Sequence, residues 1–525
     1  MKKEELIPRA NAAAQQQADP LGYSGGESRP KPERLGVSEK GAKMCAPGAA
    51  HQRLRREQDF LGKKDISADS YWGIHTLRAV ENFPITGCPV GDFPEFVRAI
   101  VLVKQAAARA NRRLGTLSPA KAEAVDKACD MIVEDGRFHD QFVVDIIQGG
   151  AGTSTNMNAN EVITNVALEL MGHDKGDYAA LHPNDDVNMA QSTNDAYPTA
   201  LRLAIVFATS GLVTALDELA YAFKAKAVAF DDVLKIGRTQ LQDAVPMTVG
   251  QEFDAFFVTI KEDVSRLKEA VALFREVNLG ATAIGTGITA DPRYAALAIE
   301  ELSRLAHQPL VPAANMIEAT SDMGAFVLFS GVLKRIAVKL SKICNDLRLL
   351  SSGPRAGFGE LHLPAVQAGS SIMPGKVNPV IPEVVNQVAY MVIGHDLTVT
   401  FCAEGGQLQL NAFEPTIAYC ILLSVRHLTA AIQVLTTRCI NGIEVDRGRC
   451  LALVEDSIGL VTALSPTVGY EAASLIAKRA LAEGRKVSDI VLEEGLLNQS
   501  QLDELLRIDA MTAPLRIKSH VRTGM

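Results

Sequence analysis

The chain has 525 residues, of which 47% are hydrophobic and 22% are charged, and its formal net charge is −8. This balance is typical of a soluble globular protein, and the length suffices for two to four domains. Acidic and basic residues are mixed along the chain, which argues against the basic patch that a nucleic-acid-coating surface needs. A small anionic substrate is compatible with the negative net charge, because a pocket can be locally positive inside an acidic protein.

Residues 1–55 differ from the rest of the chain, since they are rich in Gln, Pro, Gly, Ser and charged residues with little apolar periodicity. We expect a disordered N-terminal extension there. It lacks the apolar segment of a signal peptide, and its acidic residues argue against a transit peptide. Eight scattered cysteines without a C-x-x-C motif fit no zinc site, and they indicate a reducing, cytoplasmic location.

Helical patterns begin near Asp59 and continue through the chain. Start and stop signals predict three helices in the first part, at 95–115, 121–136 and 156–172. Alternating strands with hairpin turns are not evident, so we expect only a minor β component. No apolar run approaches the ~18 residues of a membrane span. The best candidate, 418–435, contains Arg426 and His427 and is expected to be a buried helix without membrane contact.

The longest periodic segments occupy the middle of the chain. Between residues 322 and 352, apolar residues recur at steps of three and four, as one stripe of a long helix. The stripe consists of Phe329, Leu333, Ile336, Leu340, Ile343 and Leu347. Neighbouring positions are apolar too, which favours a helix bundle shared between subunits. Similar patterns lie at 196–230, 250–277, 382–403 and 416–440. From residue 445 the segments shorten into a small C-terminal domain, with turns expected at 465–466 and 484.

Four polar segments interrupt the helices: 149–161 (GGAGTSTNMNANE), 182–198, 237–248 (GRTQLQDAVPMT) and 369–378 (GSSIMPGKVN). Any one alone is explained by helix capping, with Thr153 or Asn194 as the N-cap. Four together indicate one convergent site. Neutral donors plus one lysine suit the binding of carboxylates. The spacing fits neither a metal site nor a P-loop.

The last of these segments contains two candidates for a proton-abstracting base. Ser370 is able to act as a base if its alkoxide is stabilised by Lys376 and by backbone N–H groups. Lys376 is the rival, with a pKa depressed by burial. The spacing of the two residues does not choose between them.

The four segments, in this order, resemble the signature motifs of the aspartase/fumarase superfamily, over about Asp59 to Leu505. The resemblance implies an all-α fold of three domains with minor β structure, in which the long helices of four subunits form one core. The implied boundaries are a 56–191 N-terminal domain, a 192–442 central bundle and a 443–525 C-terminal domain. Active sites would form where segments of different subunits meet in a homotetramer.

Within the superfamily the chain is more similar to the aspartases, because Gln240 and Thr193 stand where fumarases typically have histidine and serine. The segment at His182 is fumarase-like. The resemblance implies an ammonia-lyase that removes the Cβ proton of L-aspartate and forms fumarate and ammonia through an aci-carboxylate. The alternatives are a fumarase acting on fumarate and L-malate, or a non-catalytic scaffold.

The resemblance also assigns roles to single residues. Ser370 would be the general base. Lys376 and Asn378 would bind the α-carboxylate. Thr153, Ser192, Thr193 and Ser371 would hold the β-carboxylate, and Asn194, Thr239 and Gln240 would surround the amino group. Neither a metal nor an organic cofactor is expected, and activation by a divalent ion is not readable from the sequence. Glu383 corresponds to an acid that partners the fumarase histidine.

Overall fold

The computed structural model of the chain describes residues 53–513. The predicted N-terminal extension therefore lies almost entirely outside the described residues. Its boundary at residue 55 is two residues too late, because Leu54–Asp59 forms strand β1, which pairs antiparallel with β2 (Gly62–Ser67).

The first part of the chain contains α1 (Ile74–Asn82), α2 (Pro94–Leu114), α3 (Pro119–Val133) and α4 (Thr153–Leu170). These bounds confirm the three helices expected from start and stop signals. Helix α2 ends at Gly115, whose φ of 77° closes the last turn, and Ser118 caps α3 by accepting the Lys121 N–H.

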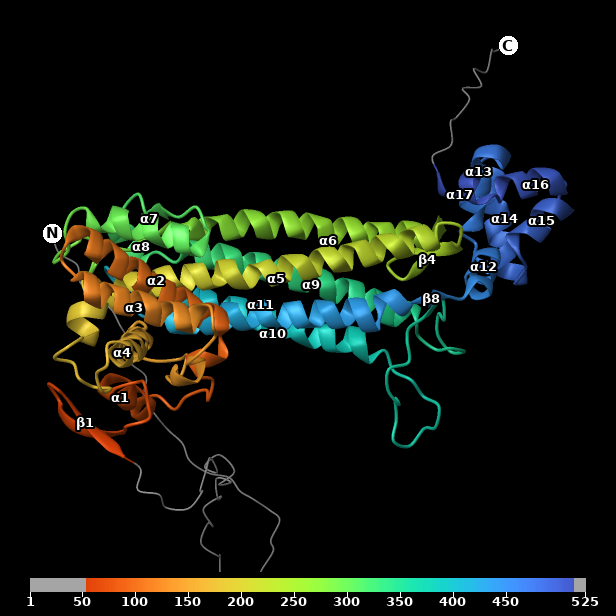
Figure 1. Cartoon of the computed structure of the whole chain (residues 1–525). Helices are drawn as coiled ribbons and strands as arrows, with labels where there is room; N and C mark the ends of the chain where they lie inside the picture. The colour runs from red at the N-terminus through yellow and green to blue at the C-terminus, as the bar shows by residue number, and fades with distance from the viewer. Residues whose placement is uncertain (1–52, 514–525) are drawn as a thin grey trace, which may run out of the picture. The chain divides into compact units, whose positions relative to one another are not determined.

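Five long helices make the bundle (Figure 1): α5 (Thr193–Ala229), α6 (Val249–Val271), α9 (Gly324–Leu350), α10 (Val380–Glu404) and α11 (Glu414–Arg438). Helix α5 packs on α6 and α11, and α10 packs on α9 and α11. The predicted stripe of α9 is buried from Phe329 to Leu347. The mainly helical fold class is thereby confirmed.

Helix α5 and the stretch Glu414–Gly442 are long and apolar enough to cross a membrane by length and composition. The expectation that no segment of the chain reaches this length was therefore wrong. Within the structure, 61% and 56% of the two apolar windows are buried. The burial expected for 418–435 is confirmed, because α11 packs against α5 and α10.

Short elements connect the long helices. Strands β3 (Leu234–Thr239) and β4 (Gln242–Thr248) form a hairpin between α5 and α6. The remaining connections contain β5 (Glu276–Val277), α7 (Tyr294–Ala306), β6 (Val311–Pro312), α8 (Met316–Ser321), β7 (Leu361–His362) and β8 (Glu444–Val445). Strand β5 pairs with β6, and β7 with β8.

The C-terminal elements are α12 (Arg447–Asp456), α13 (Leu460–Val468), α14 (Tyr470–Glu483), α15 (Val487–Glu493), α16 (Gln499–Leu505) and α17 (Ile508–Thr512). They share a second apolar cluster that includes Leu464, Ile476 and Ile490. The turn expected at 465–466 is wrong, because Pro466 lies inside α13. The turn at Gly484 is confirmed.

The predicted domain boundaries fall at breaks between elements. Ser192 is the N-cap of α5, and a 3-10 turn, Ile440–Gly442, follows α11. The described residues nevertheless belong to one compact unit. The division into three domains therefore stays a prediction.

Candidate active site

The ten predicted site residues lie in three groups. The first group, at the N-termini of α4 and α5, is Thr153, Ser192, Thr193 and Asn194. The second group, at the β3–β4 turn, is Thr239 and Gln240. The third group, in the loop before α10, is Ser370, Ser371, Lys376 and Asn378.

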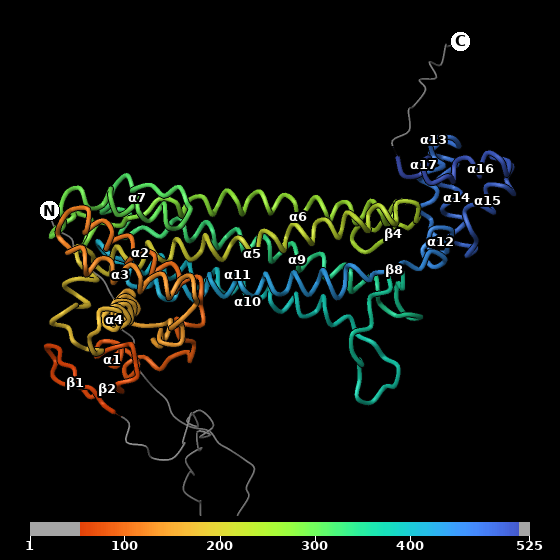
Figure 2. Tube along the Cα trace, viewed as in Figure 1, coloured from red at the N-terminus to blue at the C-terminus, as the bar shows by residue number. Residues whose placement is uncertain are grey.

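One chain does not bring the three groups together. Helix α5 separates the first two groups by its 37 residues, or about 55 Å at 1.5 Å per residue. Figure 2 shows α4 and the β4 hairpin at opposite ends of the long helices. The last turn of α9 lines a cavity together with Gln240 of the β3–β4 hairpin. The third group follows α9 in the chain, so this group lies at the same end of the long helices as the hairpin.

In the first group, the structure shows which residues cap the two helices. The N-caps of α4 and α5 are Gly152 and Ser192, so neither Thr153 nor Asn194 is an N-cap. Thr193 is buried, and its Oγ1 accepts a hydrogen bond from Asn156 Nδ2 at 3.2 Å. Two helix N-termini, with their partial positive charge, are thus present beside neutral donors, an arrangement that suits a carboxylate.

Buried ionisable groups lie beneath the first group. Asp195 accepts the backbone N–H groups of Ser192, Gly280 and Thr282 at 2.9–3.0 Å, and burial raises its pKa to about 6. Lys104 of α2 is fully buried, and burial lowers its pKa to about 7. Sequence reasoning missed Lys104, although a lysine inside the apolar run AIVLVKQAAA was a signal.

In the second group, Gln240 and Leu241 form the hairpin turn with φ values of 52° and 64°. The base of the hairpin is fixed by buried ion pairs. Lys235 pairs with Glu252 at 2.6 Å and with Glu360 at 3.3 Å, and Arg238 pairs with Glu360 at 2.7 Å. Gln240 lines a cavity of about 310 Å³ together with Arg238.

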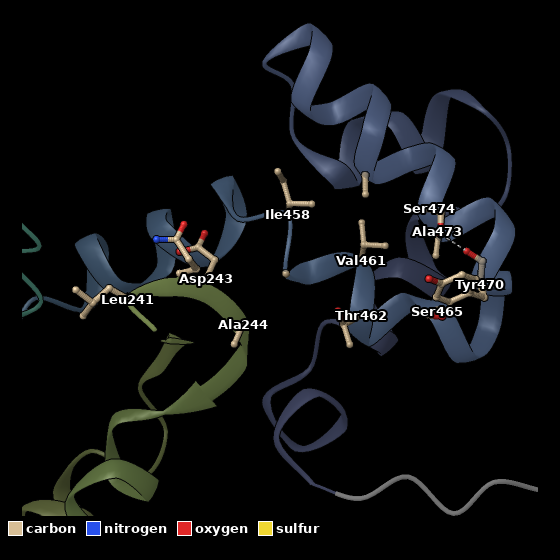
Figure 3. A pocket seen from close by; sticks show the side chains of 13 residues that line it. Leu241, Asp243, Ala244, Ile458, Val461, Thr462, Ser465, Tyr470, Ala473 and Ser474 are labelled. Carbon is tan, nitrogen blue, oxygen red and sulfur yellow. Dashed lines mark hydrogen bonds between the residues drawn. The ribbon is translucent and has the colours of Figure 1, made fainter. Parts of the chain in front are cut away.

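A larger cavity, of about 710 Å³, is lined by the hairpin turn and by the C-terminal elements. Figure 3 shows Asp243 and Ala244 of the hairpin on one side, and Ile458 of the turn after α12 and Val461 of α13 on the other. The hydroxyl of Ser457 donates to Asp243 at 2.8 Å and ties the two parts together. None of the ten predicted residues lines this cavity.

In the third group, the backbone N–H groups of Ile372 and Met373 donate to Ser370 Oγ at 3.2 and 2.9 Å. Asn378 Nδ2 donates to the Gly369 carbonyl at 2.7 Å, so Asn378 closes the loop. A Cβ atom at Gly369 would stand 2.6 Å from the Lys376 carbonyl oxygen. Only glycine therefore lets these two backbone segments approach so closely. Lys376 and Ser371 are exposed.

Among residues 53–513, His, Cys, Asp and Glu side chains form no group of three that could hold a metal ion. The expectation that the protein works without a metal or cofactor is not tested by this observation and stays a prediction.

Comparison with known proteins matches residues 62–394 to a family model described as lyase, and residues 460–513 to the fumarase C C-terminus. An aspartate ammonia-lyase of Pseudomonas canavaninivorans is 62% identical over 88% of this chain and 97% of its own length. An aspartate ammonia-lyase of Escherichia coli K12 is 53% identical over 88% of this chain and 96% of its own.

Two solved structures are similar over the whole described fold. The cobalt-bound fumarate lyase:delta crystallin of Brucella melitensis has a TM-score of 0.86 and 59% identity, and the match covers 88% of this chain and 100% of that one. The class II fumarase of Schistosoma mansoni has a TM-score of 0.82 and 33% identity, with coverages of 87% and 98%.

Proposed function

The chain belongs to the lyase family that contains the aspartate ammonia-lyases and class II fumarases, and on this premise we propose that it converts L-aspartate into fumarate and ammonia. The observation that carries the proposal is the 53–62% identity to aspartate ammonia-lyases over nearly their whole length. Identity to the fumarase structure is 33%.

The chemistry requires removal of a proton from Cβ, beside a carboxylate that already carries a negative charge. The new charge spreads onto this carboxylate as an aci-carboxylate, which preorganised donors stabilise. We assign this task to Thr153, Ser192 and Thr193, with Ser371 from the loop. Their position at two helix N-termini supports the assignment, because the helix dipoles favour negative charge there.

For the base we propose Ser370. Its Oγ accepts two backbone N–H groups, which favour a negatively charged oxygen at this position. Lys376, exposed in the free loop, is proposed to bind the α-carboxylate with Asn378. Asn194, Thr239 and Gln240 are proposed to surround the departing amino group.

We propose that the site combines residues of more than one subunit and that the protein is a homotetramer. One chain leaves its first and second groups about 55 Å apart along α5. Helix α10 exposes a row of large apolar side chains: Tyr390 at 59%, Met391 at 47%, Leu397 at 57% and Phe401 at 66%. Such a face is a candidate for contact with a second copy of this chain. A cytoplasmic location, without membrane or nucleic-acid partners, is proposed from the scattered thiols and mixed charge.

A spectrophotometric assay tests the function. The purified protein is mixed with L-aspartate or with L-malate, and fumarate is followed by its absorbance. Fumarate from aspartate but not from malate is the expected result. Fumarate from malate alone would make the protein a fumarase, and no turnover of either substrate would favour a scaffold.

A further inference from the structure

Lys104 lies beneath the first group of site residues and makes all of its hydrogen bonds to neutral amides. Its Nζ donates to Asn156 Oδ1 at 2.5 Å, to Asn188 Oδ1 at 3.0 Å and to Gln191 Oε1 at 2.9 Å. An ammonium group has three donors and no acceptor, so these contacts use it completely. No described carboxylate forms an ion pair with it, although Asp195 and the Cys129 thiol act on it from a distance.

Asn156 connects this ammonium to Thr193. Because Lys104 has only donors, the atom of Asn156 that faces it must be the carbonyl oxygen, which turns the amide NH2 group the other way. That NH2 group donates to Thr193 Oγ1 and to Asn188 Oδ1, both at 3.2 Å. Thr193 thus receives a hydrogen bond on its oxygen, and its own hydroxyl proton stays available for another acceptor.

We propose that Lys104 is a positioning residue that acts through Asn156 to fix the Thr193 hydroxyl as a donor toward the substrate carboxylate, and that its positive charge favours the additional negative charge of the aci-carboxylate. The proposal rests on the proposed function, in which Thr193 binds the β-carboxylate. Two physical effects would both stabilise the negative charge on the substrate carboxylate. Chained hydrogen bonds polarise one another, and a buried charge is weakly screened by water.

The arrangement differs from that of Lys235, another buried lysine of the described chain. Lys235 pairs with two carboxylates, so its charge is compensated within one chain. Lys104 is surrounded by amide oxygens, which solvate its ammonium form without pairing it to a carboxylate. Burial makes this ammonium form unfavourable, and Asp195 partly opposes that effect, so the proposed role belongs to the protonated lysine.

Gln191→Glu tests the role of the positive charge of Lys104 without replacing Lys104 itself. The substitution keeps the size of the side chain and places a carboxylate against the ammonium, in a half-buried position that tolerates an ion pair. The readouts are kcat and KM for L-aspartate, the inhibition constant of succinate as a dicarboxylate probe, and the temperature of unfolding. Gln433→Glu, an exposed change of the same net charge on α11, is the matched control.

We expect Gln191→Glu to fold but to unfold at a lower temperature, because it loses the hydrogen bonds that Gln191 Nε2 donates to the Val187 and Met189 carbonyls. It should bind succinate roughly tenfold more weakly and lose kcat as well, since one unit charge near an anion has an effect of this order. Gln433→Glu should match the wild type. Lys104→Met should show the same losses of succinate binding and kcat. If Lys104→Met fails to fold, the test of the proposal is Gln191→Glu alone. Unchanged succinate binding and kcat in folded Gln191→Glu would overturn the role of Lys104. A wild-type protein without activity on aspartate would instead overturn the proposed function.

Discussion

The ring of Tyr197 in α5 lies against the backbone of Gly152, and a Cβ atom on Gly152 would stand 2.2 Å from ring atom Cδ2. Gly152 is also the N-cap of α4, with a φ of 90°. This contact brings the beginnings of α4 and α5 together, and with them Thr153 and Thr193. The first group of site residues therefore depends on a position that only glycine can occupy without strain.

Gly152→Ala should destabilise the protein by about 2–4 kcal/mol, from the clash with Tyr197 and the left-handed backbone together. Activity should fall more steeply than stability, because Thr153 moves with the displaced helix start. Thermal unfolding and kcat measure the two effects. Gly448→Ala, where the new Cβ would meet Asp446 at an ordinary 3.6 Å, is the control and should unfold near the wild-type temperature.

Ser370→Ala removes the proposed base and should lower kcat by about 10²–10⁴-fold, the usual contribution of general base catalysis. Folding and assembly should be unchanged, because Ser370 contacts only the backbone of its own loop. Steady-state kinetics and sedimentation test both statements. Wild-type turnover by the alanine variant would transfer the base role to Lys376.

Much of the fold was predictable because local patterns determine it. The apolar stripe from Phe329 to Leu347 predicts a long buried helix, and the structure has α9 from Gly324 to Leu350. The turn predicted at Pro466 is wrong, because this proline lies inside α13, whereas a proline usually marks a turn. The hydrophobicity of α5 was underestimated, since polar residues divide a helix that is mostly buried in the bundle.

The site was predictable as a set of segments but not as a geometry. The motifs containing Thr153, Thr193, Gln240 and Ser370 are visible in the sequence, yet their separation within one chain follows only from the length of α5. Lys104 was missed because its three partners come from other segments, which no local pattern connects to it. Long-range hydrogen bonds of this kind appear only in the folded chain.

Stability should decrease with rising pH because of Glu414. Burial raises the pKa of this carboxyl group from 4.5 to about 8, with Arg202 opposing the shift. Between pH 4.5 and 8 the unfolded chain has lost the proton while the folded chain still binds it. Each pH unit in this window therefore removes about 1.4 kcal/mol of stability. Above pH 8 the loss should level off.

Glu414→Gln should remove the contribution of Glu414 to this dependence, because the amide resembles the protonated acid and does not ionise, while the smaller contribution of Asp195, with its pKa of about 6, stays. Unfolding temperatures of the variant and the wild type should agree near pH 5 and diverge toward pH 8, with the variant more stable. Glu471→Gln, an exposed change on α14, serves as the control. A constant difference between Glu414→Gln and wild type across this range would contradict the assignment.

Leu397→Glu tests the exposed face of α10. A charge at this 57% exposed position should be tolerated by a single chain, but it should be unfavourable once a second copy covers the face. We expect the variant to dissociate and to lose activity, as measured by sedimentation and fumarate formation. Leu481→Glu, at a 69% exposed leucine of α14, should assemble normally. A Leu397→Glu protein with wild-type assembly would place the subunit contact elsewhere.

Subunit complementation tests whether the separated groups meet between chains. Thr153→Ala alters the first group and Ser370→Ala the third, so each variant alone should be nearly inactive. If every site combines these groups from different subunits, co-refolding the two variants in equal amounts should leave both groups intact in about one quarter of the sites of random tetramers. The mixture should therefore regain up to about a quarter of wild-type kcat. Separately refolded variants combined without unfolding are the control. If both groups of a site came from the same chain, every site in the mixture would contain one altered group, and no activity would return.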